Sequence, residues 1–274
     1  LIAIPMTFIM ATAGIDLSVS SILALSGVVL GMLYNDAGLP LLPAAAGAVL
    51  VGALCGAGNG WVISRIGVPP LVVTLATMAL YRGVAMGLSK ARALAGFPQG
   101  FLWLGQGNLI QLPGGVAIPF SVAFMLLCFG LAWLIMRRPW IGRYTECIGE
   151  NPTAARFAAI PVDRMLLALY TACGLLCGVA ALFHTALYAT AKADTARGLE
   201  LEAIACVVIG GTRISGGHGA VTGTLLGLCL IGMLRHGLLL ADVRSQYVII
   251  AVGGLLIVTA VLNEWMSTAR GRSR

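Results

Sequence analysis

Charged residues are scarce in this sequence. Only 10% of its 274 residues are charged, whereas 59% are apolar, and the mean hydropathy is +0.97. A soluble domain carries about 25% charged residues, so this chain has too few polar groups to cover a surface that faces water. The composition therefore excludes a cytosolic enzyme, a nucleic-acid-binding module and a disordered protein, and it predicts an integral membrane protein.

Motifs that bind nucleotide phosphates or carry out catalysis are also absent. The sequence has no GxxxxGK[ST], GxGxxG, HExxH or GxSxG segment. Its three histidines, His184, His218 and His236, lack the spacing of metal ligands. No CxxC pair occurs among the seven cysteines, so we expect neither a metal site nor a disulfide framework. We therefore predict that this chain is not an enzyme and holds no catalytic residue, metal or cofactor of its own.

Long apolar runs, separated by prolines, glycines and charged residues, predict transmembrane helices. About 20 apolar residues cross the ~30 Å hydrocarbon core of a bilayer, and the absence of period-two alternation disfavours a β-barrel. We expect an all-α polytopic bundle with interrupted helices, forming one transmembrane domain over residues 1–274. Because Leu1 lies inside an apolar run, we also expect a segment to precede it. The predicted segments are residues 1–13, 17–34, 41–63, 69–88, 116–136, 164–187, the short 202–211, 220–239 and 246–262.

The positions of Lys and Arg predict the orientation in the membrane, because cytoplasmic loops carry the excess of positive charge. If the loop 137–164 is cytoplasmic and 202–211 counts as one crossing, that side also holds the C-terminal tail, 263–274. The basic residues on the cytoplasmic side are then Arg65, Arg137, Arg138, Arg143, Arg156, Arg164, Arg213, Arg270, Arg272 and Arg274. Those on the opposite side are Lys90, Arg92, Lys192, Arg197 and Arg244. This excess predicts a cytoplasmic C-terminus.

Glycines recur at four-residue spacing along several predicted segments, where they share one helix face. Lipid supplies no hydrophobic force that pushes helices together, so such small residues favour close contact between backbones. We therefore predict a tightly packed bundle. The glycines concerned are Gly27 and Gly31, Gly83 and Gly87, Gly174 and Gly178, and the series Gly219, Gly223 and Gly227.

A few polar residues interrupt the apolar segments and are candidates for a translocation pathway. Asp16 is the one acid predicted at membrane depth, and two interpretations remain open: it caps the helix that follows, or it contacts a substrate or ion. Arg82 lies near the end of its segment, where a long side chain is expected to reach the lipid headgroups. The predicted pathway residues are Asp16, Asn59, Thr74, Thr77 and Tyr81.

The sequence around Gly14-Ile15-Asp16 and the segment Gly210–Gly219 interrupt apolar runs in opposite halves of the chain. Non-helical backbone at membrane depth is tolerated only where it is buried in protein or lines water. Two such interruptions are typical of an internal repeat with a site near the midplane of the membrane. We therefore expect the two interruptions to frame the pathway.

The loop 137–164 is predicted to contain a short helix over residues 151–160. Asn151 suits the N-cap, Pro152 suits the first helical position, and Ile160-Pro161 ends the helix. A helix this short is not stable by itself, and its Phe157 is expected to be exposed. We therefore expect it to dock against the bundle or against a partner protein.

Three stretches carry a family resemblance: GIDLSV at 14–19, VPPLVVTL at 68–75 and EAIACVVIGGTRISGGHG at 202–219. The loop sequence GENPTAAR at 149–156 matches as well. Over nearly its whole length, the chain resembles the membrane permease subunits of bacterial ABC sugar importers, the group that serves ribose, xylose, rhamnose and autoinducer-2. Two residues depart from the family, which tends to have Gly where this chain has Glu150 and Ala159.

This resemblance implies a bacterial inner-membrane protein that imports a monosaccharide or a related polyol-like solute. Its implied partners are two cytoplasmic ATPase subunits that bind the ATP, a second permease copy or paralogue, a periplasmic sugar-binding protein and membrane lipid, but no nucleic acid. By the same resemblance, the helix within 137–163 is the coupling helix that docks on the ATPase. Its residues would be Asn151, Pro152, Ala154, Ala155, Arg156 and Phe157.

An alternative is a stand-alone secondary transporter driven by protons or sodium. That mechanism predicts several carboxylates within the membrane, whereas only Asp16 qualifies. It also gives no role to an Ala-rich docking helix. The sequence itself does not distinguish among the sugars.

Overall fold

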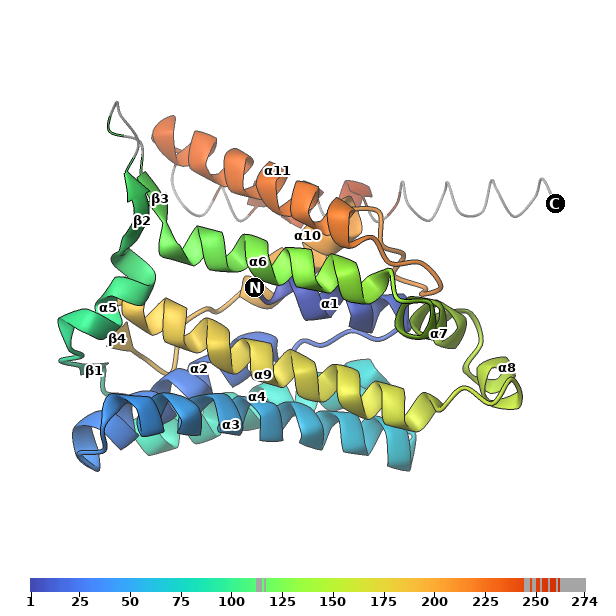
Figure 1. Cartoon of the computed structure of the whole chain (residues 1–274), viewed down its shortest axis with the longest axis horizontal. Coiled ribbons are helices and arrows are strands. Elements are labelled where there is room, and N and C mark those ends of the chain that lie inside the picture. The colour runs from blue at the N-terminus through green and yellow to red at the C-terminus, as the bar shows by residue number, and fades with distance from the viewer. Residues whose placement is uncertain are drawn as a thin grey trace.

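The computed structural model describes residues 1–111, 115, 117–243, 247, 250, 251, 253–255, 257–259 and 261. Helices dominate this part of the chain, and the long ones run roughly parallel to one another (Figure 1). In the described part, five helical segments are long and apolar enough to cross a membrane, and a sixth is counted if one sharply bent pair is a single span. These features confirm the all-α polytopic bundle.

The first half of the chain contributes the lower layer in Figure 1 and one central helix. The predicted boundaries of these segments hold to within a few residues. In chain order the elements are α1 (Ala3–Ala11), α2 (Val19–Gly31) with the π-helical turn η1 (Met32–Asp36), α3 (Leu41–Trp61) with the π-helical turn η2 (Val62–Ile66), and α4 (Pro70–Ser89). Every residue of α1 is buried, so this short helix forms the centre of the bundle.

Short strands and one helix gather at the end of the bundle that we call the α5 end (Figure 1). Neither α5 nor the strand pairs were predicted from the sequence. The predicted segment 116–136 becomes helical only at Phe120 because β3 pairs with β2. The elements are β1 (Leu94–Ala95), paired antiparallel with β4 (Thr190–Ala191); α5 (Gln99–Gln106); and β2 (Asn108–Gln111), paired antiparallel with β3 (Ala117–Pro119).

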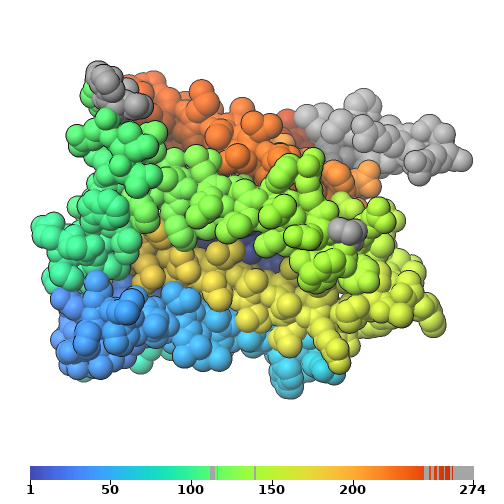
Figure 2. Space-filling view, viewed as in Figure 1, coloured from blue at the N-terminus to red at the C-terminus, as the bar shows by residue number. Residues whose placement is uncertain are grey.

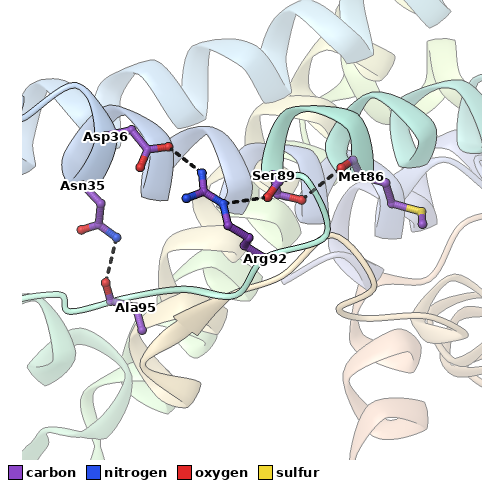
Figure 3. A network of polar contacts seen from close by, with 6 residues as sticks. All are labelled: Asn35, Asp36, Met86, Ser89, Arg92 and Ala95. Carbon is purple, nitrogen blue, oxygen red and sulfur yellow. Dashed lines mark hydrogen bonds and ion pairs between the residues drawn. The ribbon is translucent and has the colours of Figure 1, made fainter.

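Polar contacts fasten η1 to the chain that follows α4 at this end (Figure 3). A guanidinium nitrogen of Arg92 lies 3.4 Å from the carboxylate of Asp36, and Arg92 Nε donates to the Ser89 carbonyl. The Asn35 side chain donates to the carbonyl of Ala95 at 2.7 Å. Since the ion pair is exposed to solvent, it contributes little stability. Together these contacts hold the chain that follows α4 against η1.

The chain from Phe120 onward supplies the upper helices and the opposite end of the bundle. In chain order these are α6 (Phe120–Met136), α7 (Pro139–Glu150), α8 (Pro152–Phe157), α9 (Val162–Tyr188), α10 (Leu199–Ile209) and α11 (Val221–Leu240). The axes of α6 and α7 differ by 75°. We call the end that carries α7, α8 and the α10–α11 connection the α8 end (Figure 1).

The loop 137–164 contains two helices rather than the single one predicted. Helix α7 was missed, and Cys147, expected in a loop, lies within it. The predicted helix 151–160 is shorter, because α8 ends at Phe157 and Ala159 adopts a left-handed φ of 59°. Ten of the 17 residues in the predicted segment 246–262 are described, and all ten are helical. The tail 263–274 lies outside the described residues.

Glycine contacts explain how α3 and α9 approach each other. A Cβ on Gly52 would lie 2.5 Å from the Gly174 carbonyl oxygen, and one on Gly56 would lie 2.9 Å from the Gly174 Cα. The prediction of close packing is thus confirmed at Gly174, whereas Gly83 and Gly87 of α4 have no atom within 4 Å of an added Cβ. The latter pair lies on an open face of the described bundle.

Figure 2 shows α1 in dark blue between α6 and α9, which stand apart on this face of the molecule. The groove between them has a volume of about 480 Å³ and is almost entirely apolar. Ile4, Pro5 and Phe8 of α1 contribute to its lining, and Trp140 and Ile141 of α7 line it toward the α8 end. Its apolar surface suits contact with lipid or with another apolar segment.

Candidate functional site

Four polar side chains form a hydrogen-bonded chain in the interior of the bundle, where it joins the 12–18 loop to α3 and α4. Tyr81 donates to Asn59 Oδ1 at 3.1 Å, and Asn59 Nδ2 donates to Ser18 Oγ at 2.8 Å. Ser18 Oγ in turn donates to Asp16 Oδ1 at 2.6 Å. Asp16, Ser18 and Asn59 are fully buried. We call these four residues the Asp16 network.

The carboxylate of Asp16 also accepts the backbone N–H of Ser18 at 2.9 Å. Ser18 precedes the first residue of α2 and its own side chain does not cap that helix. Asp16 therefore closes a turn within the interruption and does not cap α2, contrary to the first of the two interpretations. Its other neighbours are Tyr170 and Cys173 of α9, so the carboxylate lies between the two halves of the chain.

Thr74 and Thr77 of α4 have different surroundings although they share a helix face. Thr74 is fully buried and donates to the carbonyl of Ile15 at 3.0 Å, beside the Asp16 network. Thr77 donates to Val73 of its own helix at 3.0 Å. The structure thus brings together four of the five predicted pathway residues, with Thr77 one turn away. In this arrangement most of their polar groups are occupied by one another.

Arg82 does not reach toward the lipid headgroups as predicted. Its Nη1 donates to the carbonyls of Ala193 and Thr195, each at 2.8 Å, and Nη2 donates to Ser20 Oγ at 3.2 Å. The side chain therefore turns into the protein and does not extend toward the lipid headgroups. It holds the chain between β4 and α10 against α2. The sequence did contain a signal for this position, because a charged residue within an apolar run needs partners inside the protein.

A charged pair joins α10 to α11. Arg235 Nη1 lies 3.0 Å from each carboxylate oxygen of Glu202. Together with His184 of α9, the pair contributes to the lining of a cavity of about 340 Å³. Neither residue was identified from the sequence, because the pairing depends on a contact across 33 positions. Among the described residues, no cluster of three or more His, Cys, Asp or Glu side chains is arranged to hold a metal.

Helix α8 has the predicted cap and a rigid attachment. Asn151 Oδ1 accepts the backbone N–H groups of Thr153 at 3.0 Å and Ala154 at 2.9 Å, which confirms the N-cap. Pro152 occupies the first turn, as expected. These bonds satisfy N–H groups that no helical carbonyl reaches.

The remaining predicted coupling residues divide into buried and exposed ones. Ala155 is only 3% exposed and belongs to a small apolar cluster with Ile148 and Val162. Arg156 forms an ion pair with Asp163 at 2.8 Å. Phe157, by contrast, is 90% exposed. Every residue of α8 except Ala155 is exposed, and Phe157 at its tip is the large apolar side chain that the helix offers to other molecules. Ala155 anchors the helix to α7 and α9.

The segment Gly210–Gly219 does not lie at mid-height as the sequence analysis expected. It forms the connection between α10 and α11 at the α8 end (Figure 1). That the two interruptions frame a pathway stays a prediction. The structure shows one contact between them, in which Gly217 donates its N–H to the carbonyl of Ala11 at 3.0 Å. The two interruptions therefore touch at the end of α1, and only the 12–18 loop carries buried polar side chains of the predicted pathway.

Comparison with known proteins identifies the family. Residues 1–263 match the family described as "Branched-chain amino acid transport system / permease component". The chain is 37% identical over 267 residues to the autoinducer 2 import system permease protein LsrD of Photorhabdus luminescens, with 95% of this chain and 78% of that protein covered. It is 36% identical over 288 residues to LsrD of Yersinia pseudotuberculosis serotype O:3 (strain YPIII), with 99% and 84% covered. No solved structure matches the chain.

The family match covers nearly the whole chain, and the fold agrees with it. A bundle of parallel apolar helices with a buried, interrupted centre is what a solute-conducting membrane subunit requires. The chain therefore belongs to this permease family and is a transmembrane permease component of an ABC importer.

Proposed function

We propose that the chain conducts a small sugar-like solute of the autoinducer-2 class across the bacterial inner membrane and is energised by separate ATPase subunits. The substrate class is supported by the relatives, which are named as autoinducer 2 import permeases. Energy input from a partner is consistent with the absence of phosphate-binding motifs from the sequence. In this assignment the chain shapes the pathway, and nucleotide binding by the partner shifts the population between its inward-facing and outward-facing states.

The observation that carries this proposal is Phe157. An apolar ring that is 90% exposed sits at the tip of a helix fixed by a cap, an apolar cluster and an ion pair. Aromatic side chains presented by a rigid element are typical anchors of protein interfaces. Phe157 therefore serves as the anchor that enters a groove of the ATPase, and the α8 end faces the cytoplasm.

The second permease copy and the solute-binding protein complete the proposed assembly. A bundle whose outer helices expose many large apolar side chains buries part of that surface in lipid and part against a second permease. The solute-binding protein would meet the α5 end, on the side opposite the ATPase. Asp16 would belong to the pathway only in a state that releases the bonds of its network.

Ion-coupled transport by the chain alone has little support in the structure. Among the described residues, Asp16 is the one charged side chain that is fully buried, and a series of carboxylates through the bundle is not seen there. In the Asp16 network, Asp16 Oδ1 accepts from Ser18, whose hydroxyl accepts from Asn59, and all three residues are fully buried. The α8 tip, moreover, has no role in that mechanism.

Replacing Phe157 tests the proposed function. We expect Phe157→Asp to lower co-purification of the ATPase and ATP-driven uptake of autoinducer-2 by at least about tenfold, since truncated interface anchors cost about 2 kcal/mol or more. The measurement uses the permease reconstituted in liposomes with its ATPase and solute-binding protein. Leu109→Asp is the matched control, because Leu109 is 49% exposed on β2 at the opposite end and should leave ATPase binding intact.

Two results would contradict the proposal. The first is normal uptake and normal ATPase binding in the Phe157→Asp permease. The second is uptake by the permease alone, without ATPase, when a proton or sodium gradient is applied across the liposome membrane. That second result would favour the ion-coupled alternative.

A further inference from the structure

Three segments that are far apart in the sequence meet at the α8 end. The carbonyl of Ala11, at the end of α1, accepts the N–H of Gly217 from the α10–α11 connection at 3.0 Å. Gly149, near the end of α7, lies against this hydrogen bond: a Cβ at that position would be 2.5 Å from the Gly217 nitrogen and would overlap the Ala11 carbonyl oxygen. We call these three residues the junction. Only glycine, which has no Cβ, allows α7 to approach so closely.

Neighbouring contacts hold the same three segments together. Gly216 has a φ of +83°, and a Cβ there would lie 2.8 Å from the Ala13 Cβ and 2.9 Å from the Gly149 carbonyl oxygen. His218 Nδ1 lies 3.7 Å from Glu146 Oε1, one turn earlier on α7. A Cβ on Gly217 would lie 2.6 Å from Glu150 Cγ. The final turn of α7 is therefore in contact with the α10–α11 connection along its length.

The junction is also firmly joined to α8. Ile148, next to Gly149, packs with Ala155 of α8 and Val162 of α9 in one buried cluster. Asn151, two residues after Gly149, caps α8. A displacement of the α8 tip therefore moves the last turn of α7. Side chains packed this closely move together, because a packed core does not deform gradually.

On its other side the junction leads to both interrupted segments. Ala11 is five residues from Asp16, so a shift of α1 alters the turn that anchors the Asp16 network. The α10–α11 connection continues into α11, which contacts α1 through a 2.8 Å hydrogen bond between the Thr7 and Thr224 hydroxyls. A movement of α7 therefore displaces both α1 and the α10–α11 connection, because all three meet at the junction.

We propose that Gly149 is a positioning residue for transport, which seats α7 on the Ala11–Gly217 hydrogen bond so that movement of α8 displaces α1 and the α10–α11 connection together. This inference rests on the proposed function, because it requires that a partner moves α8. Beyond the proposed function, the inference identifies the junction as the place where movement of α8 is passed on to the helices of the bundle. Gly149 contacts neither solute nor ATPase in this scheme.

The first test is Gly149→Ala in the complete transporter, with autoinducer-2 as the transported solute. We expect ATPase co-purification to remain, because the α8 tip is unchanged, while uptake falls by about tenfold, within the usual range of coupling between sites. Gly130→Ala is the matched control, since Gly130 also lies within a helix and an added Cβ there meets no atom within 4 Å. The control should transport normally.

A conformational readout distinguishes lost transmission from simple loss of folded protein. Ala13 is exposed at the junction, so Ala13→Cys, with Cys147 and Cys229 changed to Ser, reports on it through labelling by a hydrophilic maleimide. A non-hydrolysable ATP analogue should change the labelling rate in the Gly149 protein and leave it unchanged in Gly149→Ala. Two results would overturn the inference: uptake at the normal rate in Gly149→Ala, or a nucleotide-dependent change in labelling of Gly149→Ala as large as that of the Gly149 protein.

A disulfide provides a second test that does not disturb Gly149. Glu146→Cys with His218→Cys ties α7 to the α10–α11 connection where their side chains already approach. If α7 and the α10–α11 connection move as one body, the oxidised transporter retains uptake. If they slide past each other, oxidation blocks uptake and a reductant restores it. That second result would contradict the inference. Failure of the unmodified permease to bind any ATPase would instead reject the proposed function.

Discussion

Asn59 is the residue on which the Asp16 network depends. Its Nδ2 group donates to Ser18 Oγ, and its Oδ1 accepts from Tyr81. In Asn59→Leu, Tyr81 can still donate to the carbonyl of Cys55, 3.0 Å away, but the buried Ser18 hydroxyl loses its donor. We expect a loss of about 1–3 kcal/mol in the free energy of unfolding, the range for an unsatisfied buried polar group, measured as a lower Tm in detergent.

Thr77→Val is the control for this prediction. Thr77 donates only to carbonyls of its own helix, Val73 at 3.0 Å and Thr74 at 3.3 Å, and valine keeps nearly the same shape. Its Tm should therefore change less than that of Asn59→Leu. Equal changes in the two variants would show that the bond between Asn59 and Ser18 does not hold the 12–18 loop in place.

At the level of single residues, the sequence indicated which polar groups are unusual but not what they bind. Asp16, Asn59 and Tyr81 stand out because polar side chains are costly within apolar segments. Their mutual bonds depend on how α3 and α4 are arranged around the 12–18 loop. Arg82 shows the same limit: its carbonyl partners lie 111 and 113 positions away. No local pattern encodes such a contact.

Glycines from both helices take part in the contact between α3 and α9. An added Cβ at Gly56 would lie 2.9 Å from both the Cα and the backbone nitrogen of Gly174 and would overlap the Tyr170 carbonyl oxygen. We expect Gly56→Ala to force the helices apart and to lower the free energy of unfolding by about 1–3 kcal/mol, as overpacking typically does. A thermal unfolding scan in detergent measures the effect.

Gly87→Ala provides the comparison within another helix. Gly87 has no atom within 4 Å of an added Cβ, so the substitution should leave the Tm unchanged or raise it through the better helix propensity of alanine. A lower Tm for Gly87→Ala would mean that this open face of α4 is covered by another molecule under the conditions of the measurement. An unchanged Tm for Gly56→Ala would contradict the glycine contact.

Long apolar elements were predictable, and short or amphipathic ones were not. Continuous apolar runs located α3, α4, α9 and α11 to within a few residues, because membrane-spanning length leaves a strong compositional signal. Helix α7 was read as a loop because its 12 residues, PWIGRYTECIGE, mix charged, aromatic and glycine residues. The two strand pairs are each too short to show alternation, and only the tertiary arrangement brings them together.

The whole molecule has two chemically different ends. Seven of the described arginines lie at the α8 end: Arg65, Arg137, Arg138, Arg143, Arg156, Arg164 and Arg213. Four basic residues lie at the α5 end: Lys90, Arg92, Lys192 and Arg197. This excess agrees with the proposed orientation, in which the α8 end faces the cytoplasm, because cytoplasmic loops of membrane proteins carry the excess of Lys and Arg. The same end carries the α8 tip and the junction.

A native thiol allows this orientation to be measured. Cys147 is exposed on α7 at the α8 end, so in cells that express the Cys229→Ser chain without its ATPase, a membrane-impermeant maleimide should label Cys147 only after permeabilisation. Leu109→Cys, combined with Cys147→Ser, places a thiol at the α5 end and should be labelled in intact cells. The reverse pattern would place the α8 tip outside the cell, beyond the reach of any cytoplasmic ATPase, and both the proposed function and the role of Gly149 would then fail together.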